Sequence, residues 1–219
     1  MTHHVAIVAY DRLCTFEFGC AIELFALERP ELGVRWYSHA VCAVEPGPLR
    51  AMGGLTLQVP HGLDALLAAD TIVIPGWRDA DEAPPPALVE ALRAAQRRGA
   101  RICSICSGAF VLAHAGLLDG RRATTHWRYL ERLRMRFPAI AIDPAALYVD
   151  DSGIVTSAGS AAGLDMLLRT RSPACWTGYA KTSGPRIRWH RWRRRHAWGH
   201  VPSSAASRTA PACRRWPGW

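Results

Sequence analysis

Acidic residues are missing from the last quarter of this 219-residue chain. Residues 169–219 contain 12 of the 27 Lys and Arg residues and no Asp or Glu, so the positive formal charge of the chain, +9 overall, comes entirely from that segment. Residues 1–168 hold all 18 acidic residues and carry a net charge of −3. This contrast predicts one domain at 1–168, which is long enough to bury a sizeable core, followed by a basic tail at 169–219.

Long apolar runs are also missing. No stretch approaches the 18 residues that indicate a membrane-spanning helix, and the N-terminus lacks the layout of a signal peptide. Five of the seven cysteines are spread through apolar segments without the spacing of a disulfide framework, which is typical of a reducing compartment. We therefore expect a cytoplasmic protein with no membrane partner.

Short apolar segments of strand length alternate with segments of helical periodicity. Strands are predicted at 5–10, 34–44, 52–59, 71–75, 102–105, 121–127, 147–150 and 154–157, and helices at 15–27, 63–69, 86–98, 109–118, 129–137 and 160–168. Such alternation favours an α/β fold, with a mainly parallel sheet covered by helices on both faces.

The stretch RICSICSGAFVLAHAGLL, residues 101–118, is interpreted as a buried strand that turns sharply at Cys106 into a helix. A cysteine at the start of a helix faces unpaired amides and the positive end of the helix dipole, which favour its thiolate. Cys106 is therefore the leading candidate for a reactive group, and the alternative is a small core residue.

Three further candidates follow predicted strands. Glu17 lies just past Thr15, a possible N-cap, and either points into a site or only complements the helix dipole. Gly76 ends the strand at 71–75 and marks either a close backbone approach or a plain turn. His126 lies near the end of the extended segment at 121–127. Ligands bind at the carboxyl ends of parallel strands, where these residues are expected to gather with Cys106.

Cys103 and Cys106 form a C-x-x-C pattern, which can indicate a redox pair or half of a zinc site. Side chains alternate between the faces of a strand, so these two point in opposite directions until the chain turns. A second C-x-x-C is also missing from the sequence. We expect no metal and no cofactor.

The segments ICSGAFVLAHAGLLDGRRATTHWRYLERL, TFEFGCAIELF and YVDDSGIVTSAGSAAGLDMLL resemble the ThiJ/PfpI superfamily of the class I glutamine amidotransferase-like fold. More narrowly, residues 5–168 are similar to the N-terminal domain of AraC-type transcriptional regulators of the FtrA/GlxA kind. The resemblance implies a flavodoxin-like three-layer α/β sandwich with Cys106 on a nucleophile elbow. It also implies that Glu17 hydrogen-bonds the thiol, that His126 is the histidine after the next strand, and that the amides of Gly76 and Ser107 form an oxyanion hole.

The resemblance to such regulators implies a sensory domain that binds a small-molecule ligand of unknown identity and forms a homodimer. DNA would be bound only by an intact regulator. The superfamily also contains cysteine-dependent peptidases, isonitrile hydratases and deglycase-like enzymes. An enzyme of that type is the second hypothesis, because a nucleophile beside a base and two amide donors suits its chemistry. A packed, non-catalytic His126 stays open.

The segment after residue 168 departs from the resemblance, because AraC-type regulators continue there into two helix-turn-helix units. This segment is instead rich in Arg and Trp and has neither helical nor strand periodicity. We expect a regulator truncated by a frameshift, and a disordered basic tail is the second interpretation. Because arginine and aromatic side chains bind phosphates and stack on bases, a non-specific nucleic-acid binder is the third functional hypothesis.

Overall fold

The computed structural model describes residues 2–30 and 36–170. Nearly all of the predicted basic tail, from residue 171 onward, lies outside the described residues. The nucleic-acid hypothesis depends on that tail and therefore stays a prediction. The predicted division between a domain at 1–168 and a tail stays a prediction.

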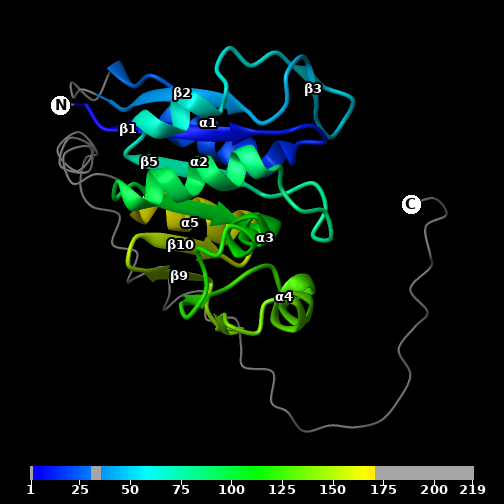
Figure 1. The fold of residues 1–219 in the computed structure, drawn as a ribbon. Coiled ribbons are helices and arrows are strands. Elements are labelled where there is room, and N and C mark those ends of the chain that lie inside the picture. The colour runs from blue at the N-terminus through cyan, green and yellow to red at the C-terminus, as the bar shows by residue number, and fades with distance from the viewer. Residues whose placement is uncertain (1, 31–35, 171–219) are drawn as a thin grey trace, which may run out of the picture. The chain divides into compact units, whose positions relative to one another are not determined.

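A six-stranded sheet forms the middle layer of the described domain (Figure 1). Its order is β2 (Ser38–Ala43), β1 (His4–Ala9), β5 (Thr71–Pro75), β6 (Arg101–Ile105), β10 (Ile154–Ser157) and β9 (Tyr148–Asp151). All neighbours pair in parallel except β9, which is joined to β10 as an antiparallel hairpin. The five parallel strands follow the 2-1-3-4-5 order of flavodoxin-like folds, which confirms the predicted fold class.

Helices cover the two faces of the sheet. On one face, α1 (Thr15–Phe25) packs against α5 (Ser160–Arg169); on the other, α2 (Pro86–Arg97) packs against α3 (Ala109–His114) and a 3-10 helix at Leu63–Ala68 (Figure 1). A further helix, α4 (Leu130–Arg136), follows a 3-10 turn at Trp127–Tyr129. The result is a three-layer sandwich.

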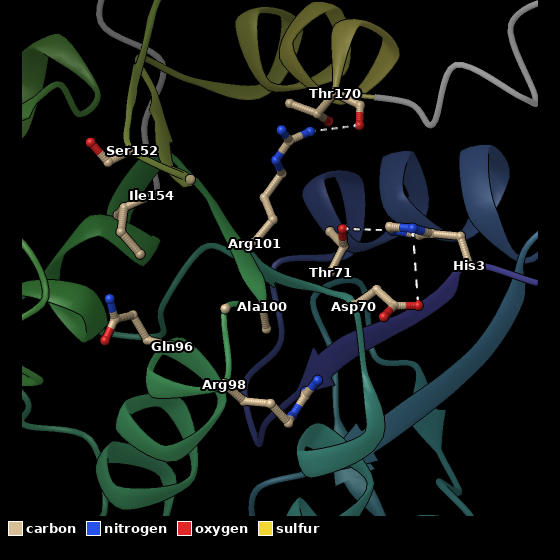
Figure 2. Close-up of a pocket in the computed structure, with 12 residues that line it drawn as sticks. His3, Asp70, Thr71, Gln96, Arg98, Ala100, Arg101, Ser152, Ile154 and Thr170 are labelled. Atoms are coloured by element: carbon tan, nitrogen blue, oxygen red, sulfur yellow. Dashed lines mark hydrogen bonds and ion pairs between the residues drawn. The ribbon is translucent and has the colours of Figure 1, made fainter. Parts of the chain in front are cut away.

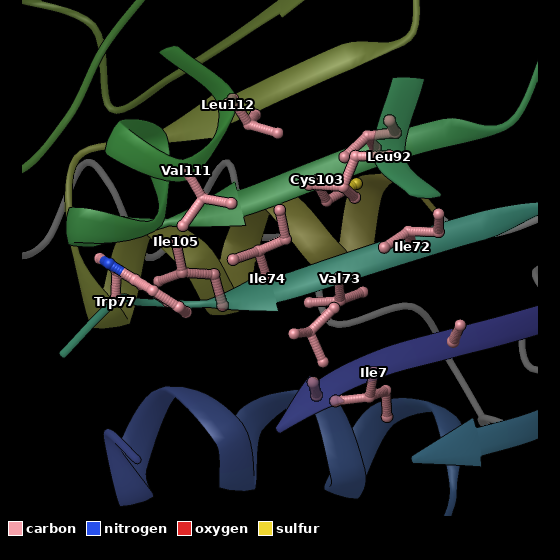
Figure 3. Close-up of a cluster of buried hydrophobic side chains, with 14 of the residues drawn as sticks. Ile7, Ile72, Val73, Ile74, Trp77, Leu92, Cys103, Ile105, Val111 and Leu112 are labelled. Carbon is pink, nitrogen blue, oxygen red and sulfur yellow. The ribbon is translucent and has the colours of Figure 1, made fainter. Parts of the chain in front are cut away.

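The core lies between the sheet and these helices. Every residue of β5 is buried, as expected for a central parallel strand with both faces covered. Figure 3 shows the branched side chains of Ile72, Val73 and Ile74 spreading from this strand, with Ile105 beside them. Burial of this apolar surface is the main free energy that holds the strand ends in place.

Two predicted strands are mostly turn or irregular backbone. The segment 52–59 contributes only β4 (Thr56–Leu57), which forms a small hairpin with β3 (Leu49–Arg50). Gly53 and Gly54 both have positive φ and form the turn, so the glycines mark the hairpin tip. In the segment 121–127, only β7 (Arg122–Ala123) pairs, with β8 (Ala141–Ile142) in a separate two-stranded sheet. The predicted strand at 34–44 begins at Ser38, and residues 31–35 are outside the description.

Candidate functional site

Cys106 lies at the carboxyl end of β6, where the chain turns sharply. The strand ends at Ile105, and Cys106 opens a 3-10 helix, Cys106–Gly108, that leads directly into α3. Its φ of +54° is in the left-handed region, which costs a residue other than glycine about 1–3 kcal/mol and is often found at functional sites. The thiol is partly exposed, whereas Cys20, Cys42 and Cys103 are buried.

The protonation state of Cys106 differs from the expectation of a favoured thiolate. Burial, with a smaller contribution in the same direction from the nearby charge of Glu17, raises the pKa of the Cys106 thiol to about 11. The backbone amide of Ser107 lowers this pKa, but by less than burial raises it. The sequence prediction did not include desolvation, which disfavours the charged form of a thiol. Cys106 is therefore a neutral thiol at pH 7.

Glu17 lies in the first turn of α1 and its carboxylate contacts α5. Its Oε1 accepts a hydrogen bond of 2.7 Å from the hydroxyl of Ser160, the first residue of α5. Within the described residues, no hydrogen bond joins Glu17 to Cys106, and Glu17 acts on the thiol through its charge. The predicted N-cap is also different: Thr15 is already helical, and its hydroxyl donates to the carbonyl of Met52.

Alkylation of Cys106 is expected to be slow at pH 7 and to accelerate about tenfold per pH unit toward pH 11, because only the thiolate reacts. Glu17→Gln retains an acceptor for Ser160 but removes the charge beside the thiol. It should lower the pKa of Cys106 and speed alkylation at pH 8 about three- to tenfold. Iodoacetamide labelling with peptide mass mapping measures the rate, and Glu90→Gln on α2 is the control. Equal rates for the Glu17 variant and the parent would contradict the proposed influence of this charge.

Gly76 follows β5, at a position where both the backbone conformation and the close neighbours favour glycine. Its φ is +83°, and a Cβ at this position would lie 3.1 Å from both the Cys14 sulfur and the Tyr10 hydroxyl. Its amide donates to the carbonyl of Ile74 at 3.0 Å, inside the turn. Because this donor is already used, the geometry counts against the predicted oxyanion-hole role of Gly76.

Ser107 joins the cysteine turn to the segment after β5. Its hydroxyl accepts from the Trp77 amide and donates to the Trp77 carbonyl, each at 2.9 Å, and the side chain is buried. The Ser107 amide lies next to the Cys106 thiol and lowers its pKa. Of the two amides predicted for an oxyanion hole, Ser107 is the one that the structure places at the sulfur.

His126 reaches the same edge of the sheet but contacts other partners. Its Nδ1 accepts from the amide of Arg128 at 3.3 Å, which caps the following 3-10 helix. The ring also packs on Gly159, where a Cβ would lie 3.1 Å from the His126 Cδ2 atom. The link to the cysteine is made by the preceding residue, since the Thr125 hydroxyl donates to the Cys106 carbonyl at 2.7 Å.

Sequence reasoning missed three residues of this arrangement. Cys14 precedes α1 and lies against Gly76, Thr125 holds the cysteine turn, and Ser160 binds Glu17. Ser160 was recognisable as the start of a helix, but its partner is 143 residues away. Only the tertiary fold brings them together.

Within residues 2–30 and 36–170, no group of three or more His, Cys, Asp or Glu side chains is arranged to hold a metal ion. In the same part of the chain, no helix is long and apolar enough to cross a membrane.

Known proteins share this domain. The CdhR helix-turn-helix transcriptional regulator of Pseudomonas aeruginosa is 34% identical over 134 residues, which cover 61% of this chain and 39% of CdhR. The isonitrile hydratase of Pseudomonas putida is 31% identical over 127 residues, 55% of this chain and 52% of the hydratase. The chain thus spans less than two thirds of the length of either relative.

Solved structures share the fold. The crystal structure of an AraC family transcriptional regulator from Pseudomonas putida superposes with a TM-score of 0.67 at 19% identity, covering 83% of this chain and all of that one. The DJ-1/PfpI family model matches residues 3–170, from β1 to the end of α5. Because the match spans more than three quarters of the chain, the protein belongs to the DJ-1/PfpI family.

Proposed function

We propose that the described residues form the sensory, ligand-binding and dimerising domain of an AraC-type transcriptional regulator. The domain is shared with known transcriptional regulators. The observation that supports a sensory role over catalysis is that the groups around Cys106 are not activated. The Cys106 thiol is neutral, and the Gly76 amide is bonded within its own turn. Neither group is prepared for nucleophilic catalysis, which needs an activated nucleophile and free donors for the developing charge.

Dimerisation is supported by an exposed apolar surface, the hairpin patch, formed by Phe16, Met52 and Leu55. These side chains are 64%, 64% and 55% exposed. The hydrogen bond from Thr15 to the Met52 carbonyl, 3.0 Å long, places the start of α1 beside the tip of the β3–β4 hairpin. An exposed apolar patch of this kind marks an interface, and a two-fold dimer buries the same patch of both copies.

Phe16→Asp and Met52→Asp are expected to weaken the homodimer, because each places a charge in the buried interface. A central interface residue contributes roughly 2 kcal/mol, so each change should raise the dimer Kd about thirtyfold. Sedimentation equilibrium of the full chain measures this. Met135→Asp on α4 is the matched control, since that side chain is 74% exposed and lies outside the patch. A monomeric parent chain, or dimers that tolerate both substitutions, would refute the proposal.

The second candidate function is a cysteine-dependent hydratase, favoured by the isonitrile hydratase among the relatives and by the strained backbone of Cys106. It predicts a thiol that is ionised near neutral pH. The alkylation profile described above separates the two functions, because a plateau below pH 8 would favour the hydratase.

A further inference from the structure

Two partly exposed cysteines lie at the carboxyl edge of the sheet. Cys106 follows β6, and Cys14 lies between β1 and α1, directly before the helix. The other three cysteines of the described residues, Cys20, Cys42 and Cys103, are buried. This edge therefore holds two thiols that reagents can reach, one from the second strand of the sheet and one from the fourth.

The strand register brings these two cysteines together. Pro75 pairs with Ile105 in the parallel strands β5 and β6, so Gly76 and Cys106 follow strand ends that are about 4.8 Å apart. Cys14 packs on Gly76: its sulfur lies 3.1 Å, and its Cβ 3.3 Å, from the position that a Cβ of Gly76 would take. The missing side chain of Gly76 thus leaves the space that Cys14 fills, beside Cys106.

The two thiols also share one electrostatic environment. A charge on the Cys14 thiolate raises the pKa of Cys106, and the Glu17 carboxylate raises the pKa of both cysteines. Such an influence is typical of groups about 4–6 Å apart. Disulfides span about 4.4–6.8 Å between Cα atoms, so the two cysteines lie at a separation that a modest shift of the Cys14 loop can close.

The C-x-x-C pattern of Cys103 and Cys106 is a different pair. Cys103 is fully buried, and burial raises its pKa to about 12. Side chains alternate along β6, so Cys103 shares the face of Ile105, which packs against Gly163 of α5. Cys103 is therefore shielded from oxidants in the folded protein, although it is the nearer cysteine in the sequence.

The opposite, amino edge of the sheet has polar groups but no thiol. Figure 2 shows its cavity of about 530 Å³, where Arg101 reaches past Thr71 and donates to the Thr170 carbonyl at 3.1 Å. None of the residues that line this cavity is a cysteine. Within the described part of the chain, accessible thiols are thus confined to the carboxyl edge.

From this arrangement we infer that Cys14 and Cys106 form a redox pair that hydrogen peroxide converts to a disulfide. The thiolate of one cysteine attacks a peroxide oxygen, the O–O bond breaks, and the leaving hydroxide takes up the proton of that thiol to form water. The other thiol attacks the resulting sulfenic sulfur, so the S–S bond forms, the S–O bond breaks and a second water leaves. Two thiols are oxidised and one peroxide is reduced.

Burial keeps both thiols mainly protonated at pH 7, so the oxidation is slow there and accelerates with pH. The disulfide ties the Cys14 loop to the end of β6. The same loop is bonded to the β3–β4 hairpin: the Leu13 amide donates to the Arg50 carbonyl at 3.0 Å, and the Met52 amide donates to the Leu13 carbonyl at 3.1 Å. Oxidation therefore acts on the loop that supports the hairpin patch. As a signal for the sensory domain it rests on the proposed function, whereas the chemistry of the pair does not.

Peptide mapping without reduction tests the pair on the full chain after treatment with hydrogen peroxide at pH 8. A peptide that joins Cys14 to Cys106 and is released by dithiothreitol supports the inference. It should form in the parent and in the control Cys103→Ala, and it should be absent from Cys14→Ser and Cys106→Ser. The map names the joined residues, so disulfides of Cys175 or Cys213 are recognised separately.

The Cys14→Ser variant gives a second readout. Without the partner thiol, the sulfenic acid of Cys106 is not resolved, so peroxide should convert severalfold more of Cys106 to sulfinic acid than in the parent. No Cys14–Cys106 peptide in the parent, a Cys103–Cys106 peptide in its place, or equal sulfinic acid in the parent and Cys14→Ser overturns the inference. Failure of the proposed regulator function is detected separately, by the oligomeric state of the Phe16 and Met52 variants.

Discussion

Gly108→Ala is expected to destabilise the domain by about 2–3 kcal/mol, the upper part of the usual cost of overpacking. A Cβ at Gly108 would lie 2.8 Å from the Ile74 carbonyl oxygen and 3.3 Å from the Gly76 amide nitrogen. Both atoms belong to the backbone of the central strand β5 or its turn, and Tyr10 also donates to the next carbonyl, that of Pro75. Because β5 is paired on both sides, it has little freedom to move.

Gly19→Ala is the matched control for this substitution. Gly19 is an exposed residue of α1, and apart from its chain neighbours and the backbone of its own helix no atom lies within 4 Å of the position that its Cβ would take. Alanine there should stabilise the protein by about 0.5–1 kcal/mol, the difference in helix propensity. Urea unfolding of both variants measures the free energies. If Gly108→Ala unfolds like the parent, the close packing of the cysteine turn on β5 is refuted.

Arg78→Met is expected to cost about 2 kcal/mol. The Arg78 side chain is 10% exposed, and its guanidinium bonds Glu82 at 2.6 Å and also Glu45 while lying 4.6 Å from the Trp77 ring centre. Methionine leaves Glu45 without an ion-pair partner, while Glu82 keeps its pair with Arg12. Removing one partner costs about 3–5 kcal/mol for fully buried pairs. Glu45 and Glu82 are 27% and 37% exposed, so solvent screening reduces this loss.

Two comparisons test the origin of this loss in urea unfolding. Arg132→Met removes a pair with Asp81 in which the side chains are 46% and 62% exposed, so it should cost less than about 1 kcal/mol. Adding Glu45→Gln to Arg78→Met should restore part of the stability, because it removes the charge that Arg78→Met leaves without an ion-pair partner. If the double variant is less stable than Arg78→Met, lost packing explains the effect better than lost charge pairing.

Local patterns identified most of the fold. The apolar run at 71–75 is a strand because both faces of it are covered, and Gly99 ends α2 with a φ of +89°. The apolar run and the helical spacing within residues 101–118 placed Cys106 at a strand-to-helix turn, and the chain does turn there. Where two glycines stand inside an apolar alternation, at 53 and 54, the strand pattern was misleading because the glycines form the turn of a short hairpin.

The chemistry of the candidate site was less predictable than its position. Burial, which raises the pKa of Cys106, depends on how α1 and α5 close over the strand ends. Three contacts could not be read from the sequence: Ser160 binds Glu17, the Gly76 amide bonds inside its own turn, and His126 packs on Gly159. Residue type and spacing identify which groups gather at an edge, but the hydrogen bonds among them depend on distances of tenths of an ångström.

Helix α5 connects the two edges of the sheet. It starts at Ser160, bonded to Glu17 at one edge of the sheet, and ends beside Thr170, bonded to Arg101 at the other. Its ten residues form a rod about 15 Å long that hardly compresses along its axis. Gly163 seats the rod against Ile105 and leaves no room there for even one added carbon. One continuous, tightly packed helix therefore connects the hydrogen bond of Glu17 at one edge of the sheet with the hydrogen bond of Arg101 at the other.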